Sequence, residues 1–464
     1  MTMKPKYFLA LGLLALGLGS CGESFFEQYP SNNITEGNFY KTDDDFNQGV
    51  VACYAKLKTQ MSFHLTEIGY RGDENVLESM AVSTQNRYDI DHFAETANNG
   101  ILNDIWNAWY NGIYRCNDVL DHMTGAKIAN YDKYRGECLF LRSWWYFNLY
   151  RVFGVVPVTR TVTAPAAAKL IPRCTEEEMY TLLTEDLAEA ARLLPPTPGP
   201  EKARVANIAA YTLLAKVYLT FGKPAEAKTA LEEAMKNTSY GLESTTKKVF
   251  DVGNKMNREI IFALYYNKTN DNGHGYWYSA NTDVLADINN PTPTFKAIYD
   301  SEKDNRLPLI SSYTKIKDNL FAMTKWYDTY DATYTTQVGN DFPHLRYADV
   351  VLMYAEALAE SGGSLGDALE WLNKTRTRAG LDELTTDEVK SLAEFRRELA
   401  AERGREFALE GHRWFDLVRL GLAVDYFREM GYSLDSHNLI FPIPQSQIEI
   451  VNNPSILWQN PGFN

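Results

Sequence analysis

Cysteine and histidine are scarce in this chain, which has 5 Cys and 7 His among 464 residues. No CxxC pair and no Cys/His cluster occurs, which argues against a zinc site. Four widely spaced cysteines follow residue 21, namely Cys53, Cys116, Cys138 and Cys174. Their even number would allow two disulfides in an exported protein, but each has apolar or helical neighbours in the sequence. We therefore expect buried free thiols.

Positive charge is also in short supply. The formal net charge is -14, from 46 Lys and Arg against 60 Asp and Glu. A chain this acidic has no broad basic face for phosphates, so we exclude nucleic acid as a partner. Charge would not hold it on an anionic lipid surface either.

Long apolar runs are absent except near the N-terminus. There, Lys4 and Lys6 precede an uncharged run at residues 7–19, shorter than the roughly 20 apolar residues that a spanning helix needs. This order is typical of a secretory signal, here residues 1–20. Residues 18–21 (LGSC) resemble a lipobox, which predicts cleavage before Cys21 and a lipid anchor on its thiol and amine. The alternative is an ordinary signal with an incidental cysteine.

Familiar catalytic motifs are missing as well. The sequence contains no GxSxG, no HExxH and no glycine-rich phosphate loop. A glycoside hydrolase needs two carboxylates in a cleft, and no feature of the sequence isolates such a pair. We therefore predict that the protein is not an enzyme.

One charged stretch could be mistaken for acid–base machinery. It contains Glu402, Arg403, Arg405, Glu406, Glu410, His412, Arg413 and Asp416. Carboxylates four residues apart with interleaved arginines are explained by ion pairs along and between helices. We interpret the stretch as scaffold.

Helical periodicity dominates what is present. Residues 40–60, 101–124 and 131–153 carry apolar residues at helical spacing, and the third segment is apolar almost all round. These patterns predict that the tryptophans of the second and third segments are core residues: Trp106, Trp109, Trp144 and Trp145. Residues 175–178 (TEEE) predict a capping box that opens the next helix, which ends at Pro195.

Two segments match the tetratricopeptide spacing of small and large residues, at 211–237 and 354–375. Weaker helical pairs lie at 137–194 and 395–421. Together they predict an all-α, tetratricopeptide-like scaffold. Residues 238–345 differ, because they are rich in Asn, Asp, Gly, Tyr and Thr and have little periodicity. We expect long loops with minor short strands there, where binding residues commonly lie.

Four stretches of the sequence carry a family resemblance. They are residues 136–158 (GECLFLRSWWYFNLYRVFGVVPV), 345–362 (LRYADVVLMYAEALAESG), 403–421 (RGREFALEGHRWFDLVRLG) and 441–463 (FPIPQSQIEIVNNPSILWQNPGF). With these stretches the mature chain resembles the SusD/RagB family of outer-membrane lipoproteins from Bacteroidota. The Asp-x-Arg at 304–306 is similar to one that precedes the family's later loops. The resemblance implies an N-terminal helical region at 21–235 and a C-terminal region with binding loops at 236–464, forming one integrated unit.

The resemblance also implies a role. A SusD-like protein is tethered at the cell surface, lies as a lid over a SusC-like TonB-dependent transporter, and hands it a captured glycan. RagB-like members take oligopeptide instead, so this alternative stays open, and a glycoside hydrolase or a plain tetratricopeptide adaptor are further alternatives. No cofactor is implied. Residues 271–273 (DNG) could contribute ligands to a calcium-binding loop, but the other ligands of an EF-hand loop are missing at the required spacing.

Candidate ligand residues combine flat rings, which cover the apolar faces of sugars, with polar groups that bond hydroxyls. The zone after the first long helix supplies Arg71, Asp73, Asn86, Arg87 and Tyr88. The central loops supply Tyr276, Trp277 and Tyr278, with Trp326, Tyr327 and Tyr330 as further candidates. Trp277 is the leading one. Trp414 and Trp458 lie in family-matching stretches and are interpreted as structural.

Overall fold

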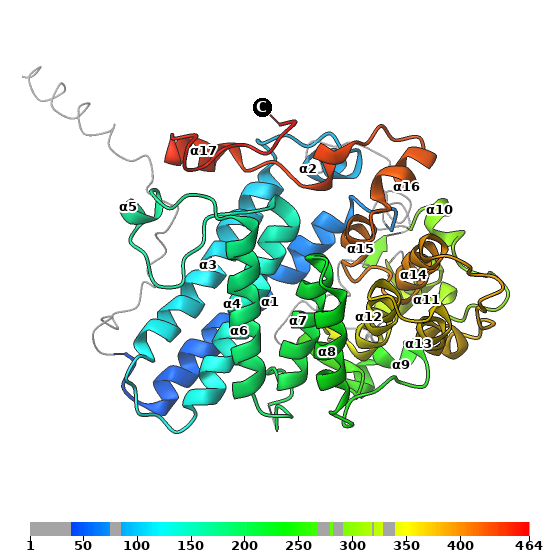
Figure 1. Cartoon of the computed structure of the whole chain (residues 1–464), viewed down its shortest axis with the longest axis horizontal. Helices are drawn as coiled ribbons and strands as arrows, with labels where there is room; N and C mark the ends of the chain where they lie inside the picture. Colours follow the sequence, from blue (N-terminus) through cyan, green and yellow to red (C-terminus); the bar gives the residue numbers. More distant parts are fainter. Residues whose placement is uncertain are drawn as a thin grey trace, which may run out of the picture.

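Antiparallel helices packed side by side form the body of the molecule (Figure 1). The computed structural model describes residues 39–74, 85–199, 201–266, 279–281, 291–317, 320–327 and 339–463. The N-terminal helices are α1 (Asp43–Gly69), α2 (Gln85–Asp91), α3 (Gly100–His122), α4 (Tyr131–Phe153), α5 (Pro165–Ala168), α6 (Glu176–Leu193), α7 (Asn207–Thr220) and α8 (Pro224–Met235). The expected helices at 40–60, 101–124 and 131–153 are therefore present, the first of them extended to Gly69.

Local sequence signals set the ends of these helices. At the start of α6, the Thr175 hydroxyl accepts a hydrogen bond from the Glu178 N–H (3.1 Å), and the Glu178 carboxylate accepts one from the Thr175 N–H (2.7 Å). This confirms the predicted capping box. Thr42 and Asp45 form the same arrangement at the start of α1. Helix α4 ends at Gly154, whose φ of +72° favours glycine.

Helices α3 and α4 meet so closely that their contact requires a glycine. A Cβ at Gly112 of α3 would lie 2.2 Å from Cε2 of Trp145 in α4. All four tryptophans of these helices are buried, as predicted. The four cysteines Cys53, Cys116, Cys138 and Cys174 are free and buried, which confirms the expected thiols. None of the helices in the described ranges is both long and apolar enough to cross a membrane.

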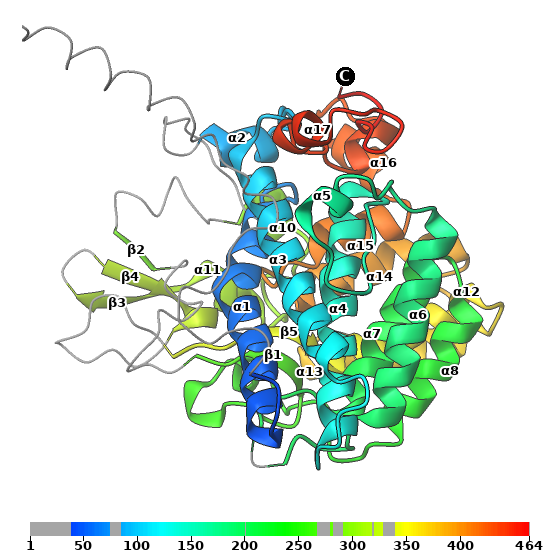
Figure 2. The same ribbon diagram turned by 90° about the vertical axis from the view of Figure 1, so that its left-hand side faces the viewer.

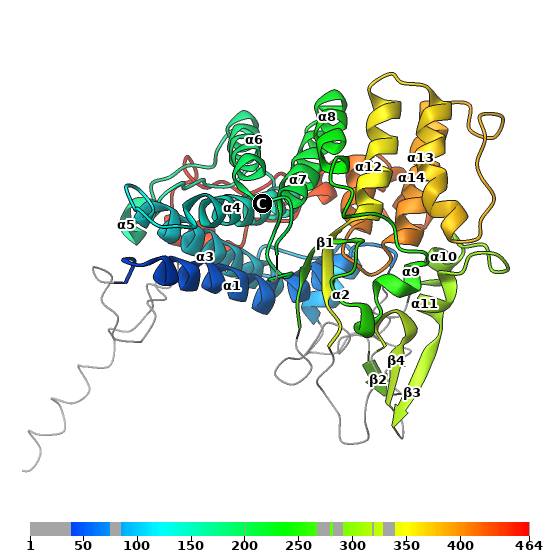
Figure 3. The same ribbon diagram turned by 90° about the horizontal axis from the view of Figure 1, so that it is seen from below.

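The two tetratricopeptide-like repeats are helix pairs that pack against each other. The first is α7 with α8, and the second is α12 (Tyr347–Glu360) with α13 (Leu365–Arg378). Helix α12 packs on α8, so the pairs stack in one row that continues from α4 and α6 to α14 (Leu392–Glu406), as Figure 3 shows. The predicted solenoid-like scaffold is confirmed.

The last part of the chain folds back over one end of this row. It forms α15 (Arg413–Arg419), α16 (Ala423–Glu429), η5 (Ser436–Leu439) and α17 (Gln445–Val451). The Phe441 N–H donates to the Val152 carbonyl at the end of α4, and the Gln445 N–H donates to the Ala97 carbonyl just before α3. The chain end therefore lies beside α2 and the start of α3 (Figure 1).

The central segment contains the short strands that the sequence led us to expect. Strands β1 (Ile260–Leu264) and β5 (Phe342–Arg346) form a buried antiparallel pair, and a second sheet has the order β2 (Ser279–Asn281), β4 (Leu320–Met323), β3 (Tyr313–Lys317). Short helical turns accompany them: α9 (Thr246–Val249), η2 (Val252–Asn254), α10 (Pro293–Lys296), α11 (Leu307–Ser311) and η4 (Thr324–Trp326). Figure 2 shows the three-stranded sheet projecting from one side of α1, away from the helix row.

Candidate ligand-binding surface

The two loop zones that the sequence analysis singled out both join the scaffold along α1. The first zone continues directly from α1, and the second zone leaves β1 and returns at α10. Two hydrogen bonds attach the second zone to this part of the molecule. The Thr292 hydroxyl donates to the Asp73 carbonyl of the first zone (2.9 Å), and the Tyr266 hydroxyl donates to the Lys58 carbonyl of α1 (3.3 Å). The side of α1 that faces the β2–β4–β3 sheet is therefore the candidate ligand-binding surface (Figure 2).

One lysine gathers the two ends of the central loops. The Lys255 ammonium donates to the carbonyls of Tyr266 and Gly339, and it pairs with the Asp341 carboxylate at 2.8 Å. Asp341 in turn accepts the Tyr266 N–H at 2.9 Å. Burial raises the pKa of Asp341 to about 6, although the neighbouring Lys255 opposes that shift. We call Lys255, Tyr266, Gly339 and Asp341 the loop clamp.

An exposed aromatic ring lies beside the loop clamp. Tyr265 is 44 % exposed, and the Lys255 ammonium lies 4.0 Å from the centre of its ring. The sequence analysis did not name Tyr265. Tyr265 follows directly after β1, whose five residues are all buried, and Tyr266 beside it is buried as well. The run at 260–266 (IIFALYY) is uniformly apolar, so no pattern in the sequence marks Tyr265 as the exposed residue.

The first zone presents a pair of stacked rings. Tyr88 stacks on His92 one helical turn later, with ring centroids 3.8 Å apart, and both rings are partly exposed. The Arg87 guanidinium bonds Glu67 at 3.2 Å. Asn86 is exposed, and its side-chain oxygen accepts the Gly100 N–H. Tyr88, Arg87 and Asn86 therefore lie at or near the surface and remain candidates.

Two candidates of the first zone have a structural role instead. Arg71 is fully buried: its guanidinium lies 4.0 Å from the centre of the Phe441 ring and pairs with Glu95. Asp73 is also buried and accepts hydrogen bonds from Arg413 (2.8 Å) and from the Tyr426 hydroxyl. Predicting them as ligand residues was wrong, because both polar groups already have internal partners.

Among the remaining candidates, Trp326 was also predicted wrongly. Its ring is fully buried and packs edge-on against Phe250, with centroids 5.1 Å apart. The adjacent Tyr327 is partly exposed and stays a prediction. The other candidates lie outside the described residues: Tyr276, Trp277, Tyr278, Tyr330, the possible calcium loop at 271–273, and Cys21.

The two tryptophans near the C-terminus differ in exposure. Trp414 is buried, as its structural interpretation requires. Trp458 is 41 % exposed and therefore not a core residue, and its structural interpretation stays a prediction. Its ring is covered in part by the Arg173 guanidinium, 4.8 Å from the ring centre.

A buried network of charges joins the central segment to the C-terminal helices. Its cationic members are Arg306, Lys325, Arg346 and Arg378, and its acidic members are Glu259, Asp304, Glu402, Glu406 and Glu410. Arg346, at the end of β5, bonds Glu406 at 3.0 Å and Glu410 at 2.8 Å. Burial alone would raise the pKa of Glu406, but three surrounding arginines outweigh it and hold that pKa well below its ordinary value.

This network confirms that the stretch at 402–416 is scaffold, with two differences from the expectation. The charges are buried, and most of the ion pairs connect different elements. The Lys325 ammonium, which bonds the Glu410 carboxylate at 2.7 Å, thereby fixes the turn that leads into residues 328–338. Within the described residues, no group of three or more His, Cys, Asp or Glu is arranged to hold a metal ion.

Comparison with known protein families gives two matches along the sequence. A family model described as "SusD family" matches residues 305–463. Another, described as "Starch-binding associating with outer membrane", matches residues 29–219. The two matches together include most of the helical scaffold and the C-terminal segment, and leave out residues 220–304, where α8 and the network members Glu259 and Asp304 lie.

Whole-chain relatives agree with these matches. SusD-like protein P2 of Formosa agariphila is 25% identical, and the alignment covers 99% of this chain and 100% of the relative. The fold is similar to that of a SusD-like protein from Bacteroides fragilis (TM-score 0.79, 21% identity, covering 94% of this chain and 100% of that one). It is also similar to surface glycan-binding protein A from Bacteroides thetaiotaomicron in complex with laminarihexaose (TM-score 0.74, 22% identity, 90% and 100% covered). At these identities the structural likeness shows a shared fold.

Proposed function

Because the chain belongs to the SusD family, we propose that it captures an oligosaccharide at the outer-membrane surface and delivers it to a SusC-like TonB-dependent transporter. A lipid on Cys21 tethers it beside that partner. The regions 21–235 and 236–464 act as one unit, since buried ion pairs such as Arg413 with Asp73 and Lys216 with Asp349 join them. The glycan named for one structural relative, laminarihexaose, supports a carbohydrate as the ligand.

The observation that carries this proposal is the arrangement of the loop clamp. Lys255 gathers both ends of the central loops against α1, and Tyr265 presents its ring next to that point. An exposed aromatic face beside a rigid anchor suits a sugar ring, because the apolar face of the sugar stacks on the ring while loop side chains bond its hydroxyls.

The partners of the acidic groups in the 402–416 stretch support capture without hydrolysis. The carboxylates of Glu402, Glu406 and Glu410 are buried in ion pairs, so they are not available as general acid or nucleophile. We propose binding without catalysis.

Isothermal titration of the purified mature protein against a panel of soluble oligosaccharides, including laminarihexaose and maltohexaose, tests the proposal. We expect saturable binding, with no reducing sugar released. Tyr265→Ala should weaken it about two- to tenfold, whereas Tyr180→Ala on α6, a tyrosine of the helix row, serves as the matched control. Binding of an oligopeptide mixture with no glycan bound would favour the peptide alternative, and release of reducing sugar would favour a hydrolase.

A further inference from the structure

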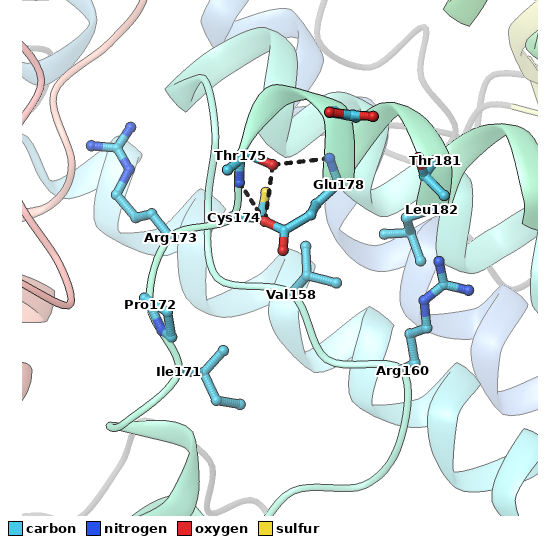
Figure 4. A pocket seen from close by; sticks show the side chains of 11 residues that line it. Val158, Arg160, Ile171, Pro172, Arg173, Cys174, Thr175, Glu178, Thr181 and Leu182 are labelled. Carbon is cyan, nitrogen blue, oxygen red and sulfur yellow. Dashed lines mark hydrogen bonds between the residues drawn. The ribbon is translucent and has the colours of Figure 1, made fainter.

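A cavity lies away from the loop clamp, between α6 and the segment at 156–174 (Figure 4). Its volume is about 720 Å³, within the usual range of small-ligand pockets. Val158 and Leu182 contribute apolar walls, while Arg160, Glu177 and Thr181 contribute polar groups. The cavity is separate from the loop clamp, because it is lined by residues 158–182 only.

The segment that forms one wall of this cavity is held rigidly. The Cys174 N–H donates to the Val156 carbonyl (3.1 Å), which closes the segment on itself. Buried side chains of α3 and α4 bond its backbone at successive points: Tyr110 at Pro157, Tyr146 and Asn117 at Thr159, and Arg142 at Arg160. A pocket whose wall is fixed in this way loses little entropy when a ligand binds.

The free hydrogen-bonding groups of the cavity are a carboxylate, which accepts, and a hydroxyl, which both donates and accepts. Glu177 and Thr181 lie one helical turn apart on α6, so they share a face, and neither side chain has a hydrogen-bond partner among the described residues. The Arg173 guanidinium already donates to Phe153, Val155 and Trp458 carbonyls and to Asn460. Arg160 remains partly exposed and bonds Glu185 at 2.9 Å.

These groups favour a neutral polyol over an anion. The start of α6 would ordinarily attract an anion, but its first turn carries Glu176, Glu177 and Glu178, and the capping box occupies the N–H groups of Thr175 and Glu178. Bonds from the Thr175 backbone and hydroxyl lower the pKa of Glu178, so this carboxylate stays ionised. A sugar supplies hydroxyl groups that can donate to the Glu177 carboxylate and can donate to or accept from the Thr181 hydroxyl.

An unusual group of exposed apolar side chains adjoins the cavity. Leu170 is 70 % exposed and immediately precedes the lining residues Ile171 and Pro172. Trp458 lies on the other side of Arg173, which lines the cavity and stacks on its ring. An exposed tryptophan next to polar groups offers a flat surface for a sugar ring.

We propose that this cavity, with Trp458 beside it, is a second carbohydrate-binding site, separate from the loop surface along α1. The inference rests on the proposed function in that it takes the same class of ligand. Two sites on one chain would hold a long oligosaccharide at two points and raise its effective concentration at the loops.

The test counts bound sugars by equilibrium dialysis and isothermal titration, using whichever of laminarihexaose and maltohexaose binds the wild type. We expect two sites per chain in the wild type. Thr181→Trp, which places a large ring in the cavity where the ligand would lie, should leave one site, and Trp458→Ala should weaken the second site about two- to tenfold. Glu176→Gln is the matched control, because Glu176 belongs to the same helical turn but does not line the cavity.

The outcomes separate the two proposals. One site in the wild type, unchanged by Thr181→Trp and Trp458→Ala, overturns the second site and leaves the proposed function standing. No binding of either sugar contradicts both proposals. A folded Thr181→Trp protein, shown by an unchanged melting temperature, is required for the comparison; if that variant does not fold, Glu177→Gln and Trp458→Ala decide it by the same count.

Discussion

Arg413 of α15 holds the Asp73 carboxylate just after α1, at 2.8 and 3.3 Å, across 340 positions of sequence. The pair is buried, and the Tyr426 hydroxyl donates to the same carboxylate. This contact fixes the turn from which the first loop zone begins. The C-terminal helices therefore determine where a surface built mainly by earlier residues is placed.

The first prediction concerns this pair. Arg413→Ala leaves a buried carboxylate without its counter-charge, so it should lower the free energy of unfolding by about 3–5 kcal/mol. Urea unfolding measures the change. The control is Arg428→Ala, which removes an exposed pair with Asp425 and should cost less than about 1 kcal/mol. Equal costs for the two variants would contradict the structural role of Arg413.

The second prediction separates the loop clamp from overall stability. Lys255→Met removes the ammonium that gathers Tyr266 and Gly339 but leaves the helical core intact. We expect glycan affinity to fall about tenfold through lost preorganisation, while the melting temperature changes little, because Asp341, whose pKa burial already raises to about 6, can take up a proton once the ammonium is gone. Lys303→Met, which removes an exposed pair with Asp382, should change neither quantity. Wild-type affinity in Lys255→Met would show that the clamp does not position the ligand surface.

The third prediction is a dependence of stability on pH. Burial, together with the neighbouring Asp73, raises the pKa of Glu74 to about 8, and Glu74 Oε1 has no hydrogen-bond partner among the described residues. Because the folded-state pKa is above the unfolded value, the stability that protonated Glu74 contributes is present below about pH 4.5 and is lost as the pH rises toward 8.

Replacing this carboxyl by a neutral isostere removes that dependence. The advantage in unfolding free energy of Glu74→Gln over the wild type should grow between pH 5 and pH 8, by at most about 1.4 kcal/mol per pH unit, and then level off. Chemical unfolding at pH 5, 6.5, 8 and 9 measures it. An advantage that is constant with pH would show that Glu74 does not titrate in this range.

Periodicity in the sequence was sufficient to predict the scaffold. The spacing of Trp106 and Trp109 in α3, and of Trp144 and Trp145 in α4, places them on buried faces, and the repeats at 211–237 and 354–375 predict the helix pairs. These signals are local, since each depends on residues within one or two helical turns.

The misassigned site residues depend on distant partners. Arg71 resembles a ligand residue in sequence, but its partners Glu95 and Phe441 come from other elements, and only the fold brings them together. The same holds for Trp326 and Phe250. Tyr265 was missed for a related reason: the run at 260–266 is uniformly apolar, and only the fold shows which of its last two rings is exposed.

The fourth prediction contrasts two tryptophans that the sequence analysis grouped together as ligand candidates. Trp277→Ala should lower glycan affinity at least tenfold without changing the melting temperature, if its ring contacts sugar. Trp326→Ala should lower the free energy of unfolding by about 3–5 kcal/mol, because it leaves a cavity in the core. Titration and thermal unfolding of both variants test the contrast. Unchanged affinity in Trp277→Ala would remove the leading ligand candidate.

The fifth prediction concerns the tether. Cys21→Ala removes the proposed lipid acceptor but leaves the described fold and its ligand surface unchanged. The purified variant should therefore bind glycan with wild-type affinity, while cells that carry it should lose the protein from the outer membrane and take up the glycan poorly. Fractionation of cells and a growth assay on that glycan measure both effects. Full uptake by a Cys21→Ala strain would show that the transporter holds its partner without a lipid, and the tether would then have no role in import.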